Sequence, residues 1–174
     1  MASILKVNTI QDATNSTTAI TMDTAGRVLT PARPAFRARI AGSTGATGTN
    51  GTLVFETEDF DIGGNYDHTN GRFTAPVAGV YWFSFDSLCA TNTSGNSNAN
   101  ADVVYVEFQK NGSAFGTRSY QYYVGLTNFQ HTINRVDVFS LSANDYITVH
   151  FGSEHAYSDQ SGVYDPCFQG YLIG

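Results

Sequence analysis

Residues that favour helices are scarce in this 174-residue sequence, which holds only 2 Lys, 4 Glu and 2 Met. Charged residues make up 14% of the chain, against about 25% in an average globular protein. Neutral polar residues take their place, with 20 Thr, 14 Ser and 13 Asn beside 17 Gly. This composition excludes a helical bundle and a coiled coil, because both are built mainly from good helix formers.

Basic clusters and long apolar runs are also missing. The nine Lys and Arg residues are scattered, and the formal net charge is −6. Proteins that bind duplex nucleic acid normally carry a basic stripe, so no nucleic-acid partner is expected. No apolar run approaches the roughly 18 residues of a membrane-spanning helix, so no membrane insertion is expected. No secretory apolar region follows Met1, and we therefore expect synthesis in a cytoplasm.

Aromatic residues are absent before Phe36 and abundant after it, with 12 Phe, 10 Tyr and one Trp. This contrast divides the chain into an N-terminal arm, residues 1–33, and a head, residues 34–174, with Pro31 and Pro34 at the boundary. The arm has too few apolar side chains to build a core. We therefore expect it to pack against another subunit or another protein, through Ile4, Leu5, Val7, Ile10, Ile20 and Met22.

Short runs rich in Val, Ile, Thr, Phe and Tyr alternate with Gly, Asn, Asp and Pro along the whole chain, which is typical of strands joined by turns. The expected arm strands are 4–10, 19–22 and 27–29. The expected head strands are 35–41, 52–57, 71–74, 79–89, 102–110, 119–124, 129–141, 146–151 and 168–173. Asn111-Gly112 indicates a tight hairpin turn, and the Gly-rich segment 42–51 is expected to be a loop. The absence of any helical pattern predicts an all-β, antiparallel sandwich preceded by an extended β arm.

Two motifs follow one another in the head. Residues 71–83 read Gly-Arg-Phe-Thr-Ala-Pro-Val-Ala-Gly-Val-Tyr-Trp-Phe, and residues 167–172 read Cys-Phe-Gln-Gly-Tyr-Leu. In this order they resemble the C1q/tumour-necrosis-factor-like globular domain, whose motifs are Gly-x-Phe-x-x-Pro-x-x-Gly-x-Tyr-x-Phe and Ser-Phe-x-Gly-Phe-Leu. Cys167 departs from the serine of the second motif. The resemblance implies a jelly-roll fold and a homotrimer with aromatic residues packed between protomers.

The strand expected at 79–89 is apolar on both faces. Tyr81 and Phe83 lie on one face, and Val80 and Trp82 lie on the other. A strand of this kind is buried on both sides, so one face meets the core and the other meets a different partner. Together with the resemblance, this predicts that a trimer interface contains Tyr81, Trp82, Phe83, Tyr120 and Tyr122.

The arm segment 4–12, Ile-Leu-Lys-Val-Asn-Thr-Ile-Gln-Asp, resembles the N-terminal segments of structural proteins of tailed phages, especially marine phages. This implies a non-enzymatic virion structural protein at the virion surface. In that interpretation the trimeric head is fibre-like or binds a receptor, and the arm attaches it to other virion proteins. Two alternatives stay open: a capsid decoration or cement protein, and a cellular C1q-like adhesion module.

Several residues are candidates for binding a host glycan or protein. The polar stretch 91–100 is expected to be an exposed loop, and Asn96 and Asn98 lie within it. Aromatic rings surrounded by polar groups suit such a ligand, because the ring face is apolar and its rim is polar. Tyr157 and Tyr164 fit this description. Tyr120 and Tyr122 fit it as well, with packing between subunits as the alternative.

No catalytic residue and no cofactor are expected. The histidines lack the spacing of a metal site. Carboxylates cluster between residues 56 and 67, which leaves calcium binding open, with a solvated acidic loop as the alternative. They are Glu56, Glu58, Asp59, Asp61 and Asp67. Cys89 and Cys167 are near enough in the implied fold to pair. Free thiols are nevertheless expected, because a cytoplasm keeps cysteines reduced.

Overall fold

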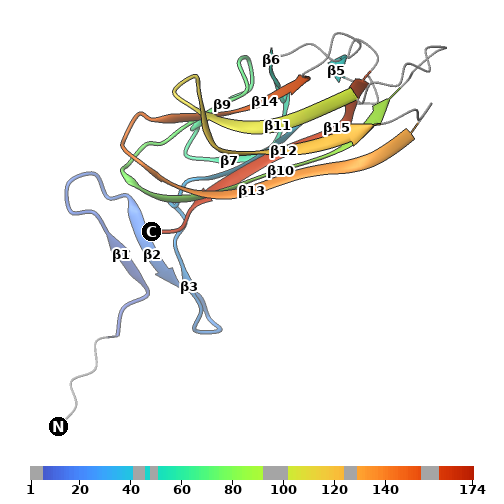
Figure 1. The fold of residues 1–174 in the computed structure, drawn as a ribbon. Helices are drawn as coiled ribbons and strands as arrows, with labels where there is room; N and C mark the ends of the chain where they lie inside the picture. The colour runs from blue at the N-terminus through green and yellow to red at the C-terminus, as the bar shows by residue number, and fades with distance from the viewer. Residues whose placement is uncertain (1–5, 41–45, 48–50, 92–101, 124–128, 154–160) are drawn as a thin grey trace.

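The computed structural model of the protein describes residues 6–40, 46–47, 51–91, 102–123, 129–153 and 161–174. These residues form strands and turns, with no helix among them and thus no helix able to cross a membrane. Figure 1 shows two head sheets packed face to face and a smaller sheet from the arm. The arm sheet projects from the end of the head where the C-terminus lies. The all-β, antiparallel sandwich expected from the sequence is confirmed.

The first head sheet has the order β13-β10-β15-β4-β7, and β5 pairs with β15 beside this path. All of its pairings are antiparallel. Its strands are β4 (Ala35–Arg39), β5 (Ala46–Thr47), β7 (Thr57–Ile62), β10 (Gly79–Thr91), β13 (Phe129–Leu141) and β15 (Ser161–Leu172).

The second head sheet has the order β12-β11-β14-β9-β8, and β6 pairs with β14. It is also antiparallel throughout. Its strands are β6 (Gly51–Thr52), β8 (Tyr66–Asp67), β9 (Arg72–Thr74), β11 (Asp102–Lys110), β12 (Ser113–Tyr123) and β14 (Tyr146–Ser153). Neighbouring strands in each sheet are often distant in sequence, which is the connectivity of a jelly roll rather than of a simple meander.

Aromatic side chains fill the space between the two sheets. In β10, Tyr81, Phe83 and Phe85 alternate with outward-facing residues and are fully buried. Phe83 from the first sheet and Phe108 from the second meet with ring centroids 6.2 Å apart, and similar contacts link the other buried rings. The fully buried aromatic residues are Phe36, Phe55, Phe73, Tyr81, Phe83, Phe85, Phe108, Phe151 and Phe168. The Phe, Tyr and Trp residues of the sequence all follow residue 35, so this core is built from the head and the arm contributes no aromatic side chain to it.

Two glycines have clear local reasons. The turn Asn111-Gly112 joins β11 to β12 with φ values of +52° and +78°, which is the left-handed geometry expected of this hairpin. Gly170 in β15 lies against the core, and a Cβ there would come within 2.4 Å of the Phe83 ring. A side chain at position 170 would therefore displace a buried aromatic ring, and the glycine of the final motif is required by packing.

The strand boundaries differ from expectation in specific places. The hairpin partner β12 begins at Ser113 rather than 119, and β15 begins at Ser161 rather than 168. The strand expected at 52–57 is wrong, because β6 covers only Gly51–Thr52 and the next strand, β7, runs from Thr57 to Ile62. The short strands β5 and β8 were not expected either, since each has two residues and depends on a neighbour for its hydrogen bonds. In the arm, β1 (Thr9–Gln11) is shorter than the expected 4–10. The arm strands β2 (Thr18–Met22) and β3 (Val28–Leu29) lie close to their predicted positions.

Candidate functional site

The outward side of the first head sheet carries a row of apolar residues. Cross-strand pairing places Trp82 of β10 beside Val138 of β13 and beside Tyr171 of β15. The Trp82 and Tyr171 rings lie 5.3 Å apart, and Val138 is 51% exposed. We call this surface the apolar face; its residues are Val80, Trp82, Val136, Val138 and Tyr171. Exposed apolar groups gathered on one sheet face indicate a contact surface rather than a catalytic site.

The prediction that Tyr81 and Phe83 form a subunit interface is wrong. Both side chains have no exposed surface in a single protomer, because alternation along β10 turns them into the aromatic core. The Tyr81 hydroxyl donates a hydrogen bond to the Val77 carbonyl oxygen at 2.8 Å. Burial raises the pKa of Tyr81, although the bond to Val77 opposes that shift. Trp82 does lie on the outward side of the strand, half-buried.

Tyr120 and Tyr122 lie on the other head sheet. Tyr120 of β12 pairs with Tyr105 of β11, and Arg118 and His150 lie beside them. The ring centroids of Tyr105 and Tyr120 are 5.8 Å apart, and those of Tyr120 and Tyr122 are 6.2 Å apart. We call this surface the tyrosine platform; its residues are Tyr105, Arg118, Tyr120, Tyr122 and His150. The five predicted interface residues therefore divide among the core, the apolar face and the tyrosine platform.

A buried carboxylate pairs with Arg118 of the tyrosine platform. Glu107 of β11 is only 3% exposed and accepts a hydrogen bond from the Arg118 Nε at 2.6 Å. A second bond comes from Gln109 at 2.9 Å. Burial opposes the charged form of Glu107, but these donors outweigh it and lower its pKa. The Arg118 guanidinium in turn lies over the Tyr105 ring, 4.2 Å from the centroid, which fixes its position.

His150 of β14 pairs with Glu107 of β11, and its ring stacks on that of Tyr105 with centroids 6.1 Å apart. Burial lowers its pKa, the nearby Glu107 carboxylate raises it, and the Arg118 charge lowers it again. The net shift is downward, so the imidazole is mostly neutral at pH 7. The tyrosine platform therefore combines a paired charge, a neutral ring and exposed phenols.

The arm forms a three-stranded sheet without a second layer. Ile10 of β1 is 48% exposed and Met22 of β2 is 38% exposed, while Val7 and Ile20 are half-buried. In a sheet with one layer, apolar side chains stay in contact with water unless a partner covers them. Ile4 and Leu5 lie outside the described residues. The attachment role of all six arm residues stays a prediction.

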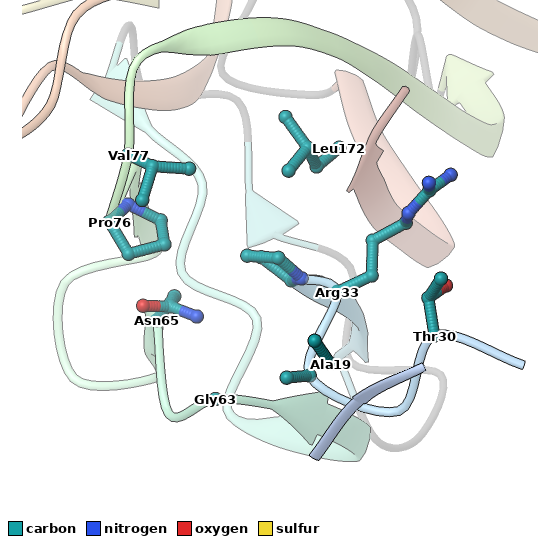
Figure 2. Close-up of a pocket in the computed structure, with 10 residues that line it drawn as sticks. Ala19, Thr30, Arg33, Gly63, Asn65, Pro76, Val77 and Leu172 are labelled. Carbon is teal, nitrogen blue, oxygen red and sulfur yellow. The ribbon is translucent and has the colours of Figure 1, made fainter. Parts of the chain in front are cut away.

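A cavity of about 430 Å³ lies where the arm meets the head (Figure 2). The Arg33 guanidinium beside it donates a hydrogen bond to the Ile173 carbonyl oxygen at 3.3 Å. The lining residues come from the arm and its exit (Ala19, Thr30, Ala32, Arg33 and Pro34) and from the head (Gly63, Asn65, Pro76, Val77 and Leu172). Most of these groups are small or apolar, and no nucleophile or carboxylate points to chemistry at this cavity.

The carboxylates that left calcium binding open are mostly engaged in other contacts. Asp59 pairs with Arg37 and with Arg39, each at 2.9 Å. Glu58 contacts the His68 ring at 2.8 Å. One Asp61 oxygen accepts the Tyr66 amide hydrogen, Asp67 caps the turn that follows it, and Glu56 is exposed. Within the described ranges, no group of three or more His, Cys, Asp or Glu side chains is arranged to hold a metal.

Several predicted residues cannot be placed. Asn96, Asn98 and Tyr157 lie outside the described residues. The backbone of Tyr164 belongs to β15 and pairs with Leu88, but its side chain is not described. Cys167 is a free, buried thiol, as expected, and burial raises its pKa.

The sequence and the fold of the head are similar to those of known proteins. A family model described as "C1q domain" matches residues 35–173. The chain belongs to the C1q domain family. The globular domain of zebrafish complement 1qA has the same fold, with a TM-score of 0.61 and 16% identity over 82% of this chain and 98% of that domain. The jelly roll implied by the resemblance is therefore shown.

Curated relatives include complement C1q tumor necrosis factor-related protein 3 from Homo sapiens and from Mus musculus. Each is 27% identical over 140 residues, which is 80% of this chain. The chain spans about half the length of these relatives. The matched C1q domain begins at residue 35, so it lies in the head and excludes the whole arm.

Sequence reasoning missed Val136, Val138 and Tyr171 on the apolar face. A signal was present, because the sequence Asn134-Arg-Val-Asp-Val-Phe-Ser140 alternates two exposed valines with Asp137 and the core residue Phe139. The role of Glu107 was also missed. A single Glu within an apolar strand gives no indication that Arg118, eleven residues later, will pair with it.

Proposed function

We propose that this C1q domain is the trimeric, non-enzymatic head of a virion structural protein of a tailed phage. The head is fibre-like or binds a receptor on the virion surface. Residues 1–33 are its attachment unit for other virion proteins, and residues 34–174 are its binding unit. The phage setting rests on the resemblance of segment 4–12 to phage structural proteins.

The observation that carries the attachment role is the single-layered arm sheet. Ile10, Met22, Val28 and Leu29 are all more than a third exposed, and they belong to a sheet whose strands have no aromatic residues. Each buried Val, Leu or Ile side chain contributes roughly 1.5–3 kcal/mol. Covering this surface with a neighbouring virion protein would therefore stabilise both the arm and the attachment.

The trimer proposal is supported by the apolar face. In a cyclic trimer each protomer contacts its two neighbours through two different patches. One continuous apolar surface on each protomer can supply both patches. Obligate interfaces commonly bury more than about 2,000 Å² and are more apolar than the rest of the surface. We expect Trp82, Val138 and Tyr171 to lie in this interface.

Native mass spectrometry tests the trimer. The wild-type protein should have three times the 18.8 kDa mass of one chain. Val138→Asp should dissociate it, because an unpaired charge would be buried in the contact. Val77→Asp is the matched control, since Val77 is exposed to a similar extent but lies outside the apolar face. A wild-type mass of a single chain rejects the trimer.

Deletion of residues 1–30 tests the attachment role. The shortened chain should remain a soluble trimer, but it should no longer join particles of the source virus. Ile10→Asp should weaken incorporation in the full chain. Thr14→Asp, in an exposed arm turn, should not. Incorporation of the shortened chain at the wild-type level would contradict the proposal.

A capsid cement protein is a second candidate, favoured by the exposed arm sheet, which can join strands of shell proteins. In a cement protein the binding energy lies in the arm, whereas a receptor-binding head needs a specific patch. Gold-labelled antibody against residues 34–174 distinguishes them on intact particles. Label at the tail tip or baseplate supports host recognition, and label over the shell supports decoration.

A cellular adhesion module is a third candidate, favoured by the 27% identity with the human and mouse C1q tumor necrosis factor-related protein 3. It needs no particle for attachment. The same antibody should then label the surface of the source cells and leave purified virus particles unlabelled.

A further inference from the structure

We propose that the tyrosine platform on strands β11, β12 and β14 binds a neutral glycan. The inference deepens the proposed receptor-binding function, on which it rests for its biological setting. It names a surface and a ligand class, while the arm and the trimer contact remain separate questions.

The aromatic rings of the tyrosine platform form a row that suits a sugar. Tyr122 is 68% exposed and Tyr120 is 38% exposed, and their rings stack at 6.2 Å with an interplanar angle of 27°. Tyr105 lies beneath Arg118 and continues the same row at 5.8 Å from Tyr120. A pyranose ring has an apolar face of C–H groups, which packs on exposed phenol rings of this kind. The row offers two such rings in succession.

The polar groups around these rings are held in place by other side chains of the protein. The Glu107 carboxylate holds the Arg118 Nε at 2.6 Å and is itself held by Gln109. The His150 ring is stacked on Tyr105. A site with fixed side chains loses less conformational entropy on binding than a mobile surface does. Hydroxyl groups of a sugar need such donors and acceptors at the rim of the apolar contact.

The charges of the tyrosine platform favour a neutral ligand. Within the tyrosine platform the Arg118 charge is balanced by Glu107, and His150 is mostly neutral at pH 7. The whole chain carries a formal charge of −6, which disfavours nucleic acid and highly acidic glycans. Among ligands with flat, partly apolar faces, a neutral saccharide fits best.

The tyrosine platform also differs from the surface assigned to the trimer. The apolar face lies on the first head sheet, and the platform lies on the second. Obligate subunit contacts contain few charged groups. The Val, Trp and Tyr residues of the apolar face match that composition. A surface that includes an ion pair and phenol hydroxyls suits a hydrated, reversible contact with a ligand instead.

The test uses the full chain on an array of neutral oligosaccharides of glucose, galactose, mannose and N-acetylglucosamine, beside sialylated and sulfated oligosaccharides. Binding of a neutral oligosaccharide is expected. Its affinity is then measured by titration calorimetry. Tyr122→Ala should weaken it about tenfold, because a stacked ring is lost. Tyr122→Phe should weaken it less than about threefold, because the ring is kept.

Phe115→Ala is the matched control. Phe115 lies on the same strand and is 39% exposed, but its ring packs on Phe139, away from the tyrosine platform. It should leave glycan affinity unchanged. Native mass spectrometry and thermal unfolding of each variant show whether the assembly and the fold are intact.

Three results would overturn the inference: no neutral oligosaccharide bound by the wild type, equal affinity for Tyr122→Ala, or binding confined to the acidic oligosaccharides. Dissociation of the assembly by Tyr122→Ala would also overturn it, because the tyrosine platform would then be a subunit contact. Glycan binding and incorporation into particles are measured separately. A negative result for glycan binding therefore leaves the proposed attachment through the arm untouched.

Discussion

The arm and the head are both built from antiparallel strands, yet they are stabilised in different ways. Head strands place alternate residues such as Phe83 and Phe168 in a core where they have no exposed surface. Arm strands have the same periodicity, but Ile10 remains 48% exposed because no second layer faces it. Strand-forming residues are therefore sufficient for secondary structure, whereas a folded domain also requires a second sheet.

The difference has a functional meaning. The head completes its core within one chain and can present surface residues such as Tyr122 on rigid strands. The arm leaves apolar side chains such as Ile10 and Val28 exposed. This difference is the basis of the proposed division of tasks, with recognition on the head and attachment on the arm. Four substitutions test this comparison, ordered from the largest expected effect to the smallest.

The largest effect is expected for Phe168→Ala in the head. Its ring contacts Phe36 and Phe83 at 4.8 and 6.0 Å and is fully buried. Truncating a buried Phe costs about 3–5 kcal/mol in the free energy of unfolding. Chemical denaturation at fixed protein concentration measures this. A loss below about 1 kcal/mol would mean that the head core is not the main source of stability.

A smaller loss is expected for Glu107→Gln. The substitution keeps the shape of the side chain but replaces a charge-assisted bond from Arg118 with a neutral one. Arg118 is partly exposed, which weakens the pair, so we expect a loss of about 1–3 kcal/mol by denaturation. Arg39→Gln, in an exposed ion pair, should cost less than about 1 kcal/mol. Equal effects for the two variants would refute the special role of the buried carboxylate.

A pH-dependent effect is expected at Asp145. Bonds from Lys110, Asn111 and Ser142 lower the pKa of this carboxyl from its ordinary 3.8 to about 2. The pKa is lower in the folded state, so the stabilisation is present above pH 4 and is lost as the pH falls towards 2. The Tm difference between the wild type and Asp145→Asn should therefore shrink over this interval. A difference that stays constant down to pH 2 would contradict this.

The smallest effect is expected in the arm. Ile10→Ser removes an exposed apolar side chain from a sheet without a core, and should change the stability of the isolated protein by less than about 0.5 kcal/mol. Thermal unfolding measures this. A loss comparable to that of Phe168→Ala would show that the arm packs on the head and would break the comparison between the two parts.

Much of the head was predictable because its signals are local. Alternating Phe and Tyr residues predict strands, and Asn111-Gly112 predicts the hairpin turn, since both depend on neighbours in sequence. The motif at 71–83 gave the family. The short strands β5 and β8 were not predictable, because each exists only through hydrogen bonds to a strand distant in sequence.

The candidate surfaces were predicted less well, for the same reason. The alternation in β10 correctly separates Tyr81 from Trp82, but it does not say which face meets the core. Tyr120 and Tyr122 have the composition of a contact surface, and nothing in the sequence relates them to Glu107 or His150. Those neighbours come from β11 and β14, which approach β12 only in the folded sheet.

By itself the sequence determined that this protein is all-β, that an aromatic-rich head follows an arm without aromatic residues, and that the head belongs with C1q domains. These conclusions follow from composition, periodicity and motifs, which are properties of neighbouring residues. Only the tertiary structure decided which tyrosines are core and which are surface, and that a buried glutamate fixes Arg118 over the Tyr105 ring. Such pairings depend on strand register between distant segments, because only the folded sheets bring those side chains within hydrogen-bonding distance.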